Sequence, residues 1–417
     1  MKNDHRRAVI TGMGVISPIG NTVGEYWSNL VSGRSGIGPI TLCDATPFPC
    51  QVAGEVNDFD PTQYMEVKDA KRMARFSQLA VAAARLAIED SGLETANTNE
   101  ERMGVVIGNG NGGFPTTEDN ARVLSERGGM KVSPYFIPMV LPNMAAANVS
   151  RIFGLKGYSS TVITACAAGT QGVGEAAEII KRGAADVVLG GGTEAGICQL
   201  GLGGFNVIKA LSSKRNDKPE SASRPFDAER DGFVPAEGAG ILVIESLDHA
   251  KSRGANILAE VISLGVSSDA YHAVQPDEDG GGAARAMRFA LEGAKIGPAD
   301  VDYINAHGTS TPKNDFSETL AIKTVFGEKA YNIPISSTKS MTGHGMGAAG
   351  ALEAVVCVKT IETGEIHATI NYDLPDPECD LDYVPNLSRK QQVDTVISNS
   401  FGFGGQNASI VIRRFQE

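Results

Sequence analysis

The segment from 160 to 195 constrains the fold more strongly than any other part of the chain. It contains a short strand-like run at 161–164, a helical stretch at 167–182 and a second strand-like run at 186–189. This order predicts a β-α-β unit, in which the two strands run parallel. The helical stretch consists mostly of Ala, Gly, Val and Ile and carries few charges before its end. A helix without a broad polar face is buried, so we predict that it lies at the centre of the molecule.

The second half of the chain repeats this pattern. A strand is predicted at 301–306 and another at 334–338, which leads through a Gly-rich turn into a helix at 346–361 that is also rich in small residues. Each half therefore contains a strand, a Gly-rich loop and a central helix of small residues. We interpret this as a weak internal duplication, although no fixed-period repeat is visible.

Hydrophobic periodicity and turn residues predict the remaining elements. The segment 108–151 is rich in Gly, Pro and Asn, and we interpret it mostly as loops and short helices that form a lid or an interface. Further strands are predicted at 8–10, 104–107, 238–246 and 257–265, helices at 71–90 and 281–293, and a closing hairpin at 395–413.

Length and composition exclude several classes of protein. A chain of 417 residues is long enough for two or three domain-sized units. Its 49 Asp and Glu residues outnumber its 37 Lys and Arg residues, which argues against a nucleic-acid-binding face. No stretch approaches the roughly 20 apolar residues of a membrane span, and we find no export signal. The six cysteines form no CxxC pair, so we expect reduced thiols in a soluble, cytoplasmic protein.

Cys166 is the strongest candidate nucleophile. It lies where a predicted strand turns into a helix, and its small Ala and Gly neighbours leave the sulfur unshielded. The unpaired N–H groups and the dipole of a helix N-terminus favour a thiolate. The same strand-turn-helix geometry presents the nucleophile of serine hydrolases. The alternative is a buried structural cysteine, which is the role we expect for Cys198 and Cys357.

Two histidines, His307 and His344, lie in Gly-rich, charge-poor loops that each follow a predicted strand. Polar side chains at the carboxyl ends of buried strands are typical of functional sites. We therefore predict that both share a site with Cys166. The three side chains are also of the kinds that bind zinc. The chain lacks an HExxH motif and a close i, i+4 pair, however, so we predict no metal.

Two Gly-rich motifs allow other interpretations. Residues 108–113 satisfy G-x-G-x-x-G after a strand, as a dinucleotide site would. Phe114 and Pro115 follow directly, and we expect them to interrupt the helix that would hold a pyrophosphate, so we exclude this function. The Phe-Gly-Phe-Gly-Gly loop at 401–405 combines flexible backbone with aromatic rings. It is suited to pointing N–H groups at an oxyanion, and an ordinary hairpin turn is the alternative.

A basic cluster stands at the start of one predicted helix in an otherwise acidic chain. A solvated helix face is the usual role of such a cluster, and a docking surface is the alternative. The cluster comprises Lys68, Lys71, Arg72 and Arg75.

These segments together resemble the condensing enzymes of fatty-acid synthesis, the β-ketoacyl-acyl-carrier-protein synthases, and most of all the type II elongation enzymes. The resemblance extends over essentially the whole chain, and several long motifs in the same order make it specific. They are V-I-T-G-M-G-V at 9–15, T-A-C-A-A-G at 164–169, S-R-P-F-D at 223–227, N-A-H-G-T-S-T-P at 305–312, S-T-K-S-M-T-G-H at 337–344 and N-S-F-G-F-G-G at 399–405.

The resemblance implies an α/β protein with the thiolase fold, in which two similar α-β-α-β-α halves form a five-layered structure, usually as a homodimer. Residues 1–255 would form the N-terminal half, which carries the nucleophilic cysteine and a cap or dimer insertion. Residues 256–417 would form the C-terminal half, which carries both histidines. The resemblance implies neither a cofactor nor a metal.

The resemblance also assigns catalytic roles. Cys166 is expected to hold the acyl chain as a thioester. His307 and His344 are expected to bind the carbonyl of the malonyl thioester as neutral donors, and Lys339 is expected to orient that pair, with Glu353 as its ionic partner. Such chemistry needs one group that holds the acyl chain and others that stabilise a carbanion away from water.

An oxyanion hole, an acyl pocket and a docking surface are implied as well. The backbone N–H groups of Cys166 and Phe403 would form the oxyanion hole. Phe403 would act as a gate and would bind substrate together with Phe401, Phe205 and Asn111, although Asn111 departs from the apolar residue that is usual in the family. Acidic acyl carrier protein would dock on Lys68, Lys71, Arg72, Arg127, Lys131 and Lys209.

The implied activity is a decarboxylating Claisen condensation between an acyl thioester on Cys166 and malonyl-acyl carrier protein. It gives 3-oxoacyl carrier protein and CO2 in fatty-acid elongation. A type II polyketide ketosynthase would use the same groups and is an alternative. A non-catalytic partner that sets chain length is a further alternative, which the presence of Cys166 disfavours. A degradative thiolase is disfavoured because the loop at 401–405 offers no second cysteine.

Overall fold

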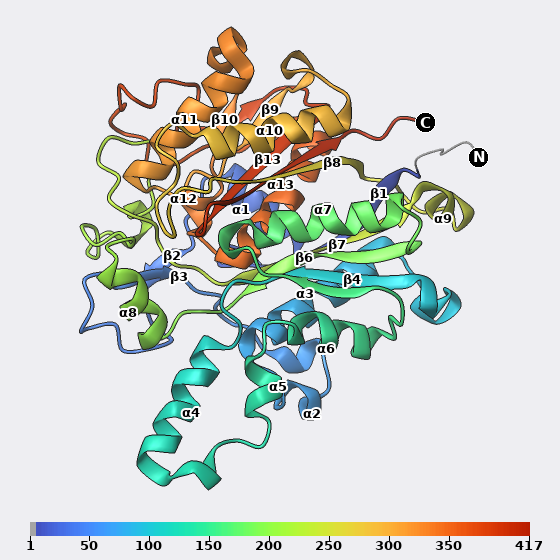
Figure 1. The fold of residues 1–417 in the computed structure, drawn as a ribbon, viewed down its shortest axis with the longest axis vertical. Coiled ribbons are helices and arrows are strands. Elements are labelled where there is room, and N and C mark those ends of the chain that lie inside the picture. Colours follow the sequence, from blue (N-terminus) through green and yellow to red (C-terminus); the bar gives the residue numbers. More distant parts are fainter. Residues whose placement is uncertain (1–5) are drawn as a thin grey trace.

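The computed structural model describes residues 6–417 and shows a mixed sheet with helices packed on it (Figure 1). The large sheet has ten strands. They are β1 Ala8–Ile16, β4 Met103–Gly108, β5 Ser159–Val162, β6 Val187–Glu194, β7 Gly238–Ser246, β8 Ala259–Ser268, β9 Tyr303–Asn305, β10 Ile335–Ser336, β13 Thr395–Gly402 and β14 Gln406–Arg413. Two small antiparallel pairs are formed by β2 Ile37–Pro39 with β3 Val52–Gly54, and by β11 Glu365–Ile366 with β12 Arg389–Lys390.

The helices fall into long ones that pack on the sheet and short ones in connections. They are α1 Val23–Val31, α2 Val67–Ala70, α3 Arg75–Ser91, α4 Phe114–Arg127, α5 Phe136–Val140, α6 Met144–Phe153, α7 Ala168–Lys181, α8 Gln199–Val207, α9 Leu247–Ser252, α10 Gly281–Ala294, α11 Pro312–Phe326, α12 Lys339–Thr342 and α13 Ala349–Thr363. Within residues 6–417, no helix has both the length and the apolar character that crossing a bilayer requires.

The strand order confirms the internal duplication. The first half reads β5-β4-β6-β7-β1 and the second reads β10-β9-β13-β14-β8. In both halves the first three strands are parallel to one another, and the last two pairings are antiparallel. The halves join through a short antiparallel pairing of β1 with β8, in which Val9 faces Glu260 and Ile10 faces Ala259.

The two small-residue helices form the central layer, as predicted. Helices α7 and α13 pack against each other between the two halves of the sheet, while α3 and α10 cover the outer faces of the first and second half (Figure 1). The crossing is close enough to require glycine: a Cβ atom at Gly350 would lie 1.9 Å from Oγ1 of Thr170. The result is a five-layered α-β-α-β-α structure with the thiolase fold.

The insertion after β4 differs from its prediction. Residues 114–127 form the 14-residue helix α4, which extends away from the rest of the molecule (Figure 1). Pro115 lies in the first turn of α4, where a proline's missing N–H leaves no helical hydrogen bond unmade. The prediction that Phe114 and Pro115 interrupt a helix is therefore wrong.

The N–H groups of the Gly-rich loop before α4 nevertheless bind a carboxylate of the protein itself, and not the pyrophosphate that a dinucleotide motif suggests. The carboxylate of Glu194 accepts hydrogen bonds from the N–H groups of Gly110 at 2.9 Å and Asn111 at 3.3 Å. Glu194 belongs to this chain and is fully buried. Its carboxylate thus takes the place at these N–H groups that a pyrophosphate would need.

Some element boundaries also differ from prediction. Strands β1 and β6 run several residues further than the short apolar runs indicated. The helix predicted at 71–90 corresponds to α3, which begins only at Arg75, because residues 71–74 form a turn after the short helix α2. The turn between these helices directs Arg75 inward, where its guanidinium donates to the buried carboxylate of Glu237 at 2.7 Å. Arg75 therefore does not belong to the exposed basic cluster, whereas Lys68, Lys71 and Arg72 are exposed.

Candidate active site

Cys166 lies in a tight turn between β5 and α7. A short 3-10 turn at Ala165–Ala167 precedes the helix, and Ala165 adopts a positive φ of 50°. A non-glycine residue in this conformation costs backbone energy, and such residues cluster at functional sites. The sulfur of Cys166 lines a cavity of about 560 Å³. The strand-turn-helix elbow predicted from the sequence is therefore present.

The protonation state of Cys166 differs from the prediction. Burial raises the pKa of its thiol to about 12, while the charge of Lys339 and the backbone N–H of Phe403 act in the opposite direction. The predicted thiolate at the helix end is therefore wrong for the unliganded site, where the thiol is protonated at neutral pH. The favourable effect of a helix terminus is modest, and burial of the sulfur outweighs it.

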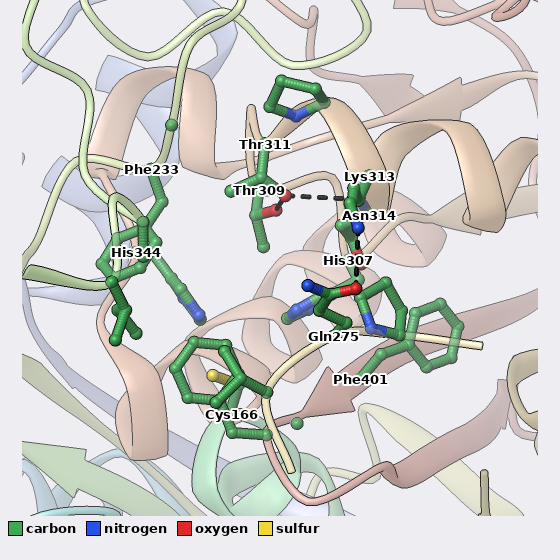
Figure 2. Close-up of a pocket in the computed structure, with 18 of the residues that line it drawn as sticks. Cys166, Phe233, Gln275, His307, Thr309, Thr311, Lys313, Asn314, His344 and Phe401 are labelled. Atoms are coloured by element: carbon green, nitrogen blue, oxygen red, sulfur yellow. Dashed lines mark hydrogen bonds between the residues drawn. The ribbon is translucent and has the colours of Figure 1, made fainter. Parts of the chain in front are cut away.

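His307 and His344 lie in the same cavity as Cys166 (Figure 2). Their ring centroids are 5.4 Å apart and the rings are nearly perpendicular, at 84°. Both side chains are buried. Within residues 6–417, Nδ1 of His307 and both ring nitrogens of His344 have no hydrogen-bond partner. Both imidazoles line the cavity, and a neutral imidazole carries one N–H donor, so each ring is suited to donating one hydrogen bond to a substrate oxygen.

Both imidazoles are neutral at neutral pH. Burial lowers the pKa of His307 well below its usual range, and the charge of Lys339 and the neighbouring His344 act in the same direction. Burial and the charge of Lys339 lower the pKa of His344 in the same way. The site therefore offers imidazole N–H donors without a positive charge on either ring.

Lys339 forms a buried ion pair with Glu353, as the sequence predicted. Its Nζ lies 2.5 Å from Oε1 of Glu353, and both side chains are almost fully buried. Lys339 is the first residue of α12, five positions before His344. Burial raises the pKa of Glu353 to about 7, and the charge of Lys339 opposes that rise. The positive field that acts on both histidines thus comes from a lysine fixed by a buried carboxylate.

Glu318 supports the site and was missed by the sequence analysis. It lies on α11, and its carboxylate accepts hydrogen bonds from the backbone N–H groups of His307 and Gly308, both at 2.8 Å. Burial raises the pKa of Glu318 to about 7, and these two hydrogen bonds oppose the rise. The carboxylate anchors the loop that carries His307. A buried glutamate on a helix has no local sequence signal, because only the tertiary structure brings it to the loop.

The β13–β14 hairpin brings the loop at 401–405 against the turn that carries Cys166. Phe401 and Phe403 line the large cavity, and the ring of Phe401 lies 5.6 Å from that of His307. A Cβ atom at Gly402 would lie 2.6 Å from the carbonyl oxygen of Thr164, so glycine is required for this close approach. The hairpin therefore closes the sheet and also places the loop at 401–405 beside Cys166.

Phe205 and Asn111, the other residues predicted to bind substrate, do not line the large cavity. Phe205 does not line the large cavity but packs against Phe233 and Phe403, with ring centroids 5.4 and 6.3 Å away. Asn111 and Phe205 line a separate, narrow cavity of about 10 Å³. Phe233, which the sequence analysis did not single out, lines the large cavity and contacts the ring of His344 edge-on at 5.4 Å.

The residues predicted to dock a carrier protein are exposed and lie on separate elements. Lys68 is on α2 and Lys71 and Arg72 follow it, Arg127 and Lys131 lie at the outer end of α4, and Lys209 follows α8. Lys209 also lines the large cavity. The described part of the chain contains no group of three or more His, Cys, Asp or Glu side chains arranged to hold a metal ion.

The fold and this site define a class of protein. A buried thiol that faces two neutral imidazoles, on a duplicated α/β fold, is the arrangement of a thiolase-fold ketosynthase. The family model "Beta-ketoacyl synthase, N-terminal domain" matches residues 5–250, and the family model "Beta-ketoacyl synthase, C-terminal domain" matches residues 258–373. The chain therefore belongs to the beta-ketoacyl synthase family.

Similar proteins cover the whole chain. It is 51% identical to the 3-oxoacyl-(acyl-carrier-protein) synthase 2 of Coxiella burnetii over 411 residues, with 99% of each chain covered. It is 49% identical to the protein of the same name from Synechocystis sp., again with 99% of each covered. Among solved structures, the ishigamide ketosynthase/chain length factor superposes with a TM-score of 0.93 at 38% identity, covering 99% of this chain and 100% of that one.

Proposed function

We propose that this chain is a β-ketoacyl-acyl-carrier-protein synthase of fatty-acid elongation. It joins an acyl group held on Cys166 to the two-carbon unit of malonyl carrier protein and releases CO2. The observation that carries the proposal is the single cavity in which the thiol meets two neutral imidazoles. The full-length relatives named 3-oxoacyl-(acyl-carrier-protein) synthase 2 support the same substrate class.

In the first step, the sulfur of Cys166 attacks the carbonyl carbon of the incoming acyl thioester. A C–S bond forms to Cys166, the C–S bond to the carrier breaks, and the proton of the cysteine thiol ends on the departing carrier thiol. We assign the oxyanion hole to the backbone N–H groups of Cys166 and Phe403. In support, both N–H groups act on the sulfur and favour its anionic form, as donors aimed at developing negative charge do.

In the second step, malonyl carrier protein enters and its thioester carbonyl oxygen accepts hydrogen bonds from His307 and His344. Cleavage of the bond to the carboxylate releases CO2 and leaves the electron pair on the thioester as an enolate. Neutral donors suit this task, because they stabilise the growing negative charge without donating a full proton to the carbanion. We assign Lys339 a positioning and electrostatic role, since its charge adds to the effect of burial in lowering the pKa of both imidazoles.

In the third step, the enolate carbon attacks the acyl thioester on Cys166. A C–C bond forms, the bond from the acyl carbon to the cysteine sulfur breaks, and the sulfur leaves as a thiolate that takes up a proton from solvent once the product has left. The product is a 3-oxoacyl thioester on the carrier. Burial of the site excludes water, which would otherwise protonate the carbanion.

We further propose an acidic acyl carrier protein as partner and a homodimer as the working assembly. A solved structure that is similar to this chain, at 37% identity and a TM-score of 0.90, is that of a type II PKS acyl-carrier protein in complex with its ketosynthase. Strand β5 lies at an end of the large sheet, and the neighbouring Tyr158 and Ile163 are exposed apolar side chains. An edge strand beside apolar surface is suited to pairing with a second copy. We place the boundary between the two halves at 255/256.

Substitutions of Cys166 test the mechanism. We expect Cys166→Ala to abolish condensation, because no thioester can form. We expect Cys166→Gln to continue malonyl decarboxylation without condensation, because the amide fills the place of the acyl thioester while both histidines remain. The measurement is mass spectrometry of carrier-bound products together with CO2 release. Elongated product from either variant would refute the mechanism.

Substitutions of the histidines test the division of labour. His307→Ala and His344→Ala should each suppress decarboxylation while intact mass still shows acyl transfer to Cys166. Equal loss of acylation in both variants would contradict the assigned roles. The polyketide alternative predicts repeated condensation on one carrier-bound product, whereas elongation predicts one two-carbon addition per cycle, and the product masses distinguish the two.

A further inference from the structure

His367 is a buried histidine that the proposed mechanism does not use. It directly follows β11, is fully buried and does not line the large cavity. Burial lowers the pKa of its imidazole to about 4, so the ring is neutral at neutral pH. Nδ1 lies 2.9 Å from the carbonyl oxygen of Ala368, and a carbonyl oxygen only accepts hydrogen bonds. Nδ1 therefore carries the proton, and Nε2 has a lone pair that accepts a hydrogen bond.

Three hydroxyl groups converge on this lone pair. Nε2 of His367 lies 3.2 Å from Oγ1 of Thr338, 3.3 Å from Oγ of Ser336 and 3.4 Å from the OH of Tyr303. The OH of Tyr303 also lies 2.7 Å from Oγ of Ser336. Each hydroxyl can donate one hydrogen bond and accept others, so the three groups and the ring form one connected, buried network.

The side chain of Asn305 determines which hydroxyl donates to the ring. Its Nδ2 donates to Oγ1 of Thr338 at 3.3 Å and to the OH of Tyr303 at 3.2 Å. An amide NH2 group only donates, so the hydroxyl hydrogen of Thr338 cannot point at Asn305. It points instead at Nε2 of His367, which is the nearest of the three ring contacts.

The network joins the two segments that carry the catalytic histidines. Strand β9 ends at Asn305, two residues before His307. Thr338 directly precedes Lys339, the first residue of α12, and lies six residues before His344. One imidazole therefore contacts the end of one catalytic segment and the start of the other.

Backbone pairing alone leaves these two segments weakly connected. Strands β9 and β10 pair at only two positions, the second of which joins Asn305 to Ser336. The chain around His367 continues the connection beyond that point, since Oγ1 of Thr369 accepts the N–H of Ser337 at 3.0 Å. The side chains thus extend a ladder that the backbone ends early.

We propose that His367 is a positioning residue, whose lone pair at Nε2 ties the end of β9 to the start of α12 and so fixes the two catalytic imidazoles relative to each other. The inference rests on the proposed function, because it requires His307 and His344 to bind one carbonyl oxygen together. Their ring centroids are 5.4 Å apart, and both rings face one cavity (Figure 2). Cys166 lies between β5 and α7 in the other half of the fold, so loss of the network should slow decarboxylation while acylation continues.

The test compares His367→Leu, which removes the lone pair, with His367→Gln, which keeps an acceptor at the end of a side chain of similar length. His249→Gln, at a partly buried histidine on α9, is the matched control. Each protein receives malonyl carrier protein, from which CO2 release is measured, and octanoyl carrier protein, from which intact mass follows acylation of Cys166. We expect His367→Leu to lower the ratio of decarboxylation to acylation by about 10- to 100-fold. His367→Gln should recover most of this loss, and the control should keep the wild-type ratio.

Thr338→Val tests the same contact from its other side, because valine has the shape of threonine without the hydroxyl. Alone it should lower the ratio in the same direction. Combined with His367→Leu it should add little, because both changes remove one shared interaction. Thr338→Val also keeps the inference testable if His367→Leu does not fold.

The outcomes separate this inference from the proposed function. An unchanged ratio in folded His367→Leu overturns the inference and leaves the function intact, as does an equal fall in His367→Gln. Fully additive losses in the double variant overturn it too, since a general loss of stability lowers both rates without coupling the two sites. A wild-type protein that neither releases CO2 nor forms the thioester refutes the proposed function and the inference with it.

Discussion

Glu318→Gln tests whether a group outside the cavity sets the position of a catalytic histidine. The carboxylate of Glu318 accepts two backbone hydrogen bonds, from His307 and Gly308, both at 2.8 Å. Glutamine has nearly the same shape but only one acceptor oxygen, and its NH2 group cannot accept the second N–H. One buried N–H on the loop that carries His307 must therefore lose its partner or move toward another.

The size of the effect follows from this single lost bond. Leaving one buried donor unsatisfied costs about 1–3 kcal/mol. The charge that is removed offsets little of this cost at neutral pH, because burial already raises the pKa of Glu318 to about 7. We therefore expect the variant to be about 2 kcal/mol less stable. A displacement of His307 by about 1 Å would lower the decarboxylation rate by up to about 100-fold.

The assay measures malonyl decarboxylation, acylation of Cys166 and urea unfolding on the same preparations. Glu328→Gln, an exposed glutamate just after α11, is the matched control and should behave as wild type in all three. Decarboxylation should fall much more than acylation, because the proposed mechanism assigns His307 to the malonyl group. A folded Glu318→Gln that decarboxylates at the wild-type rate would refute the positioning role.

Two further predictions concern stability. Burial raises the pKa of Glu194 from 4.5 to about 7, so the stabilisation from its protonated form is complete below pH 4.5 and is lost as pH rises to 7. The free energy of unfolding of Glu194→Gln should therefore increase by about 2 kcal/mol relative to wild type between pH 5 and 7, measured by urea unfolding. A difference that does not change with pH would contradict the assigned pKa. Gly350→Ala should destabilise by about 3 kcal/mol, because its Cβ would lie 2.5 Å from the backbone nitrogen of Thr170. The control Gly204→Ala, with open space around the new Cβ, should stabilise by up to about 1 kcal/mol, and equal destabilisation of both would exclude helix crowding as the cause.

The elements that the sequence predicted best are those whose signal is local. Strand β7 has the predicted boundaries, and the two small-residue helices were predicted to be central because no polar face could point to solvent. Cys166 was found because it lies where a strand turns into a helix, and His307 and His344 because each lies in a Gly-rich loop after a strand; the ends of such strands meet in one cavity.

The groups that escaped prediction act through tertiary contacts. Glu194 binds a backbone N–H group 84 residues before it in the chain, and Glu318 binds two N–H groups 11 and 10 residues before it, on the loop that carries His307. Nothing in their immediate neighbours distinguishes them from surface glutamates. The helix α4 was missed for a different reason, since Pro115 was interpreted as a break when it begins the helix.

The same physical effect explains why the predicted thiolate of Cys166 was wrong and why the predicted neutral histidines agree with the structure. Burial disfavours every charged form, so it raises the pKa of a thiol and lowers the pKa of an imidazole; here it does both within one cavity. A permanently charged thiolate beside the two rings would favour their protonation, and a protonated imidazole would quench an enolate rather than stabilise it. Lys339 supplies the opposing field, since its charge lowers the pKa of the thiol and of both imidazoles at once. The charge of the buried lysine therefore partly opposes the effect of burial on the thiol and adds to the effect of burial on both imidazoles, and its ion pair with Glu353 holds that charge in place.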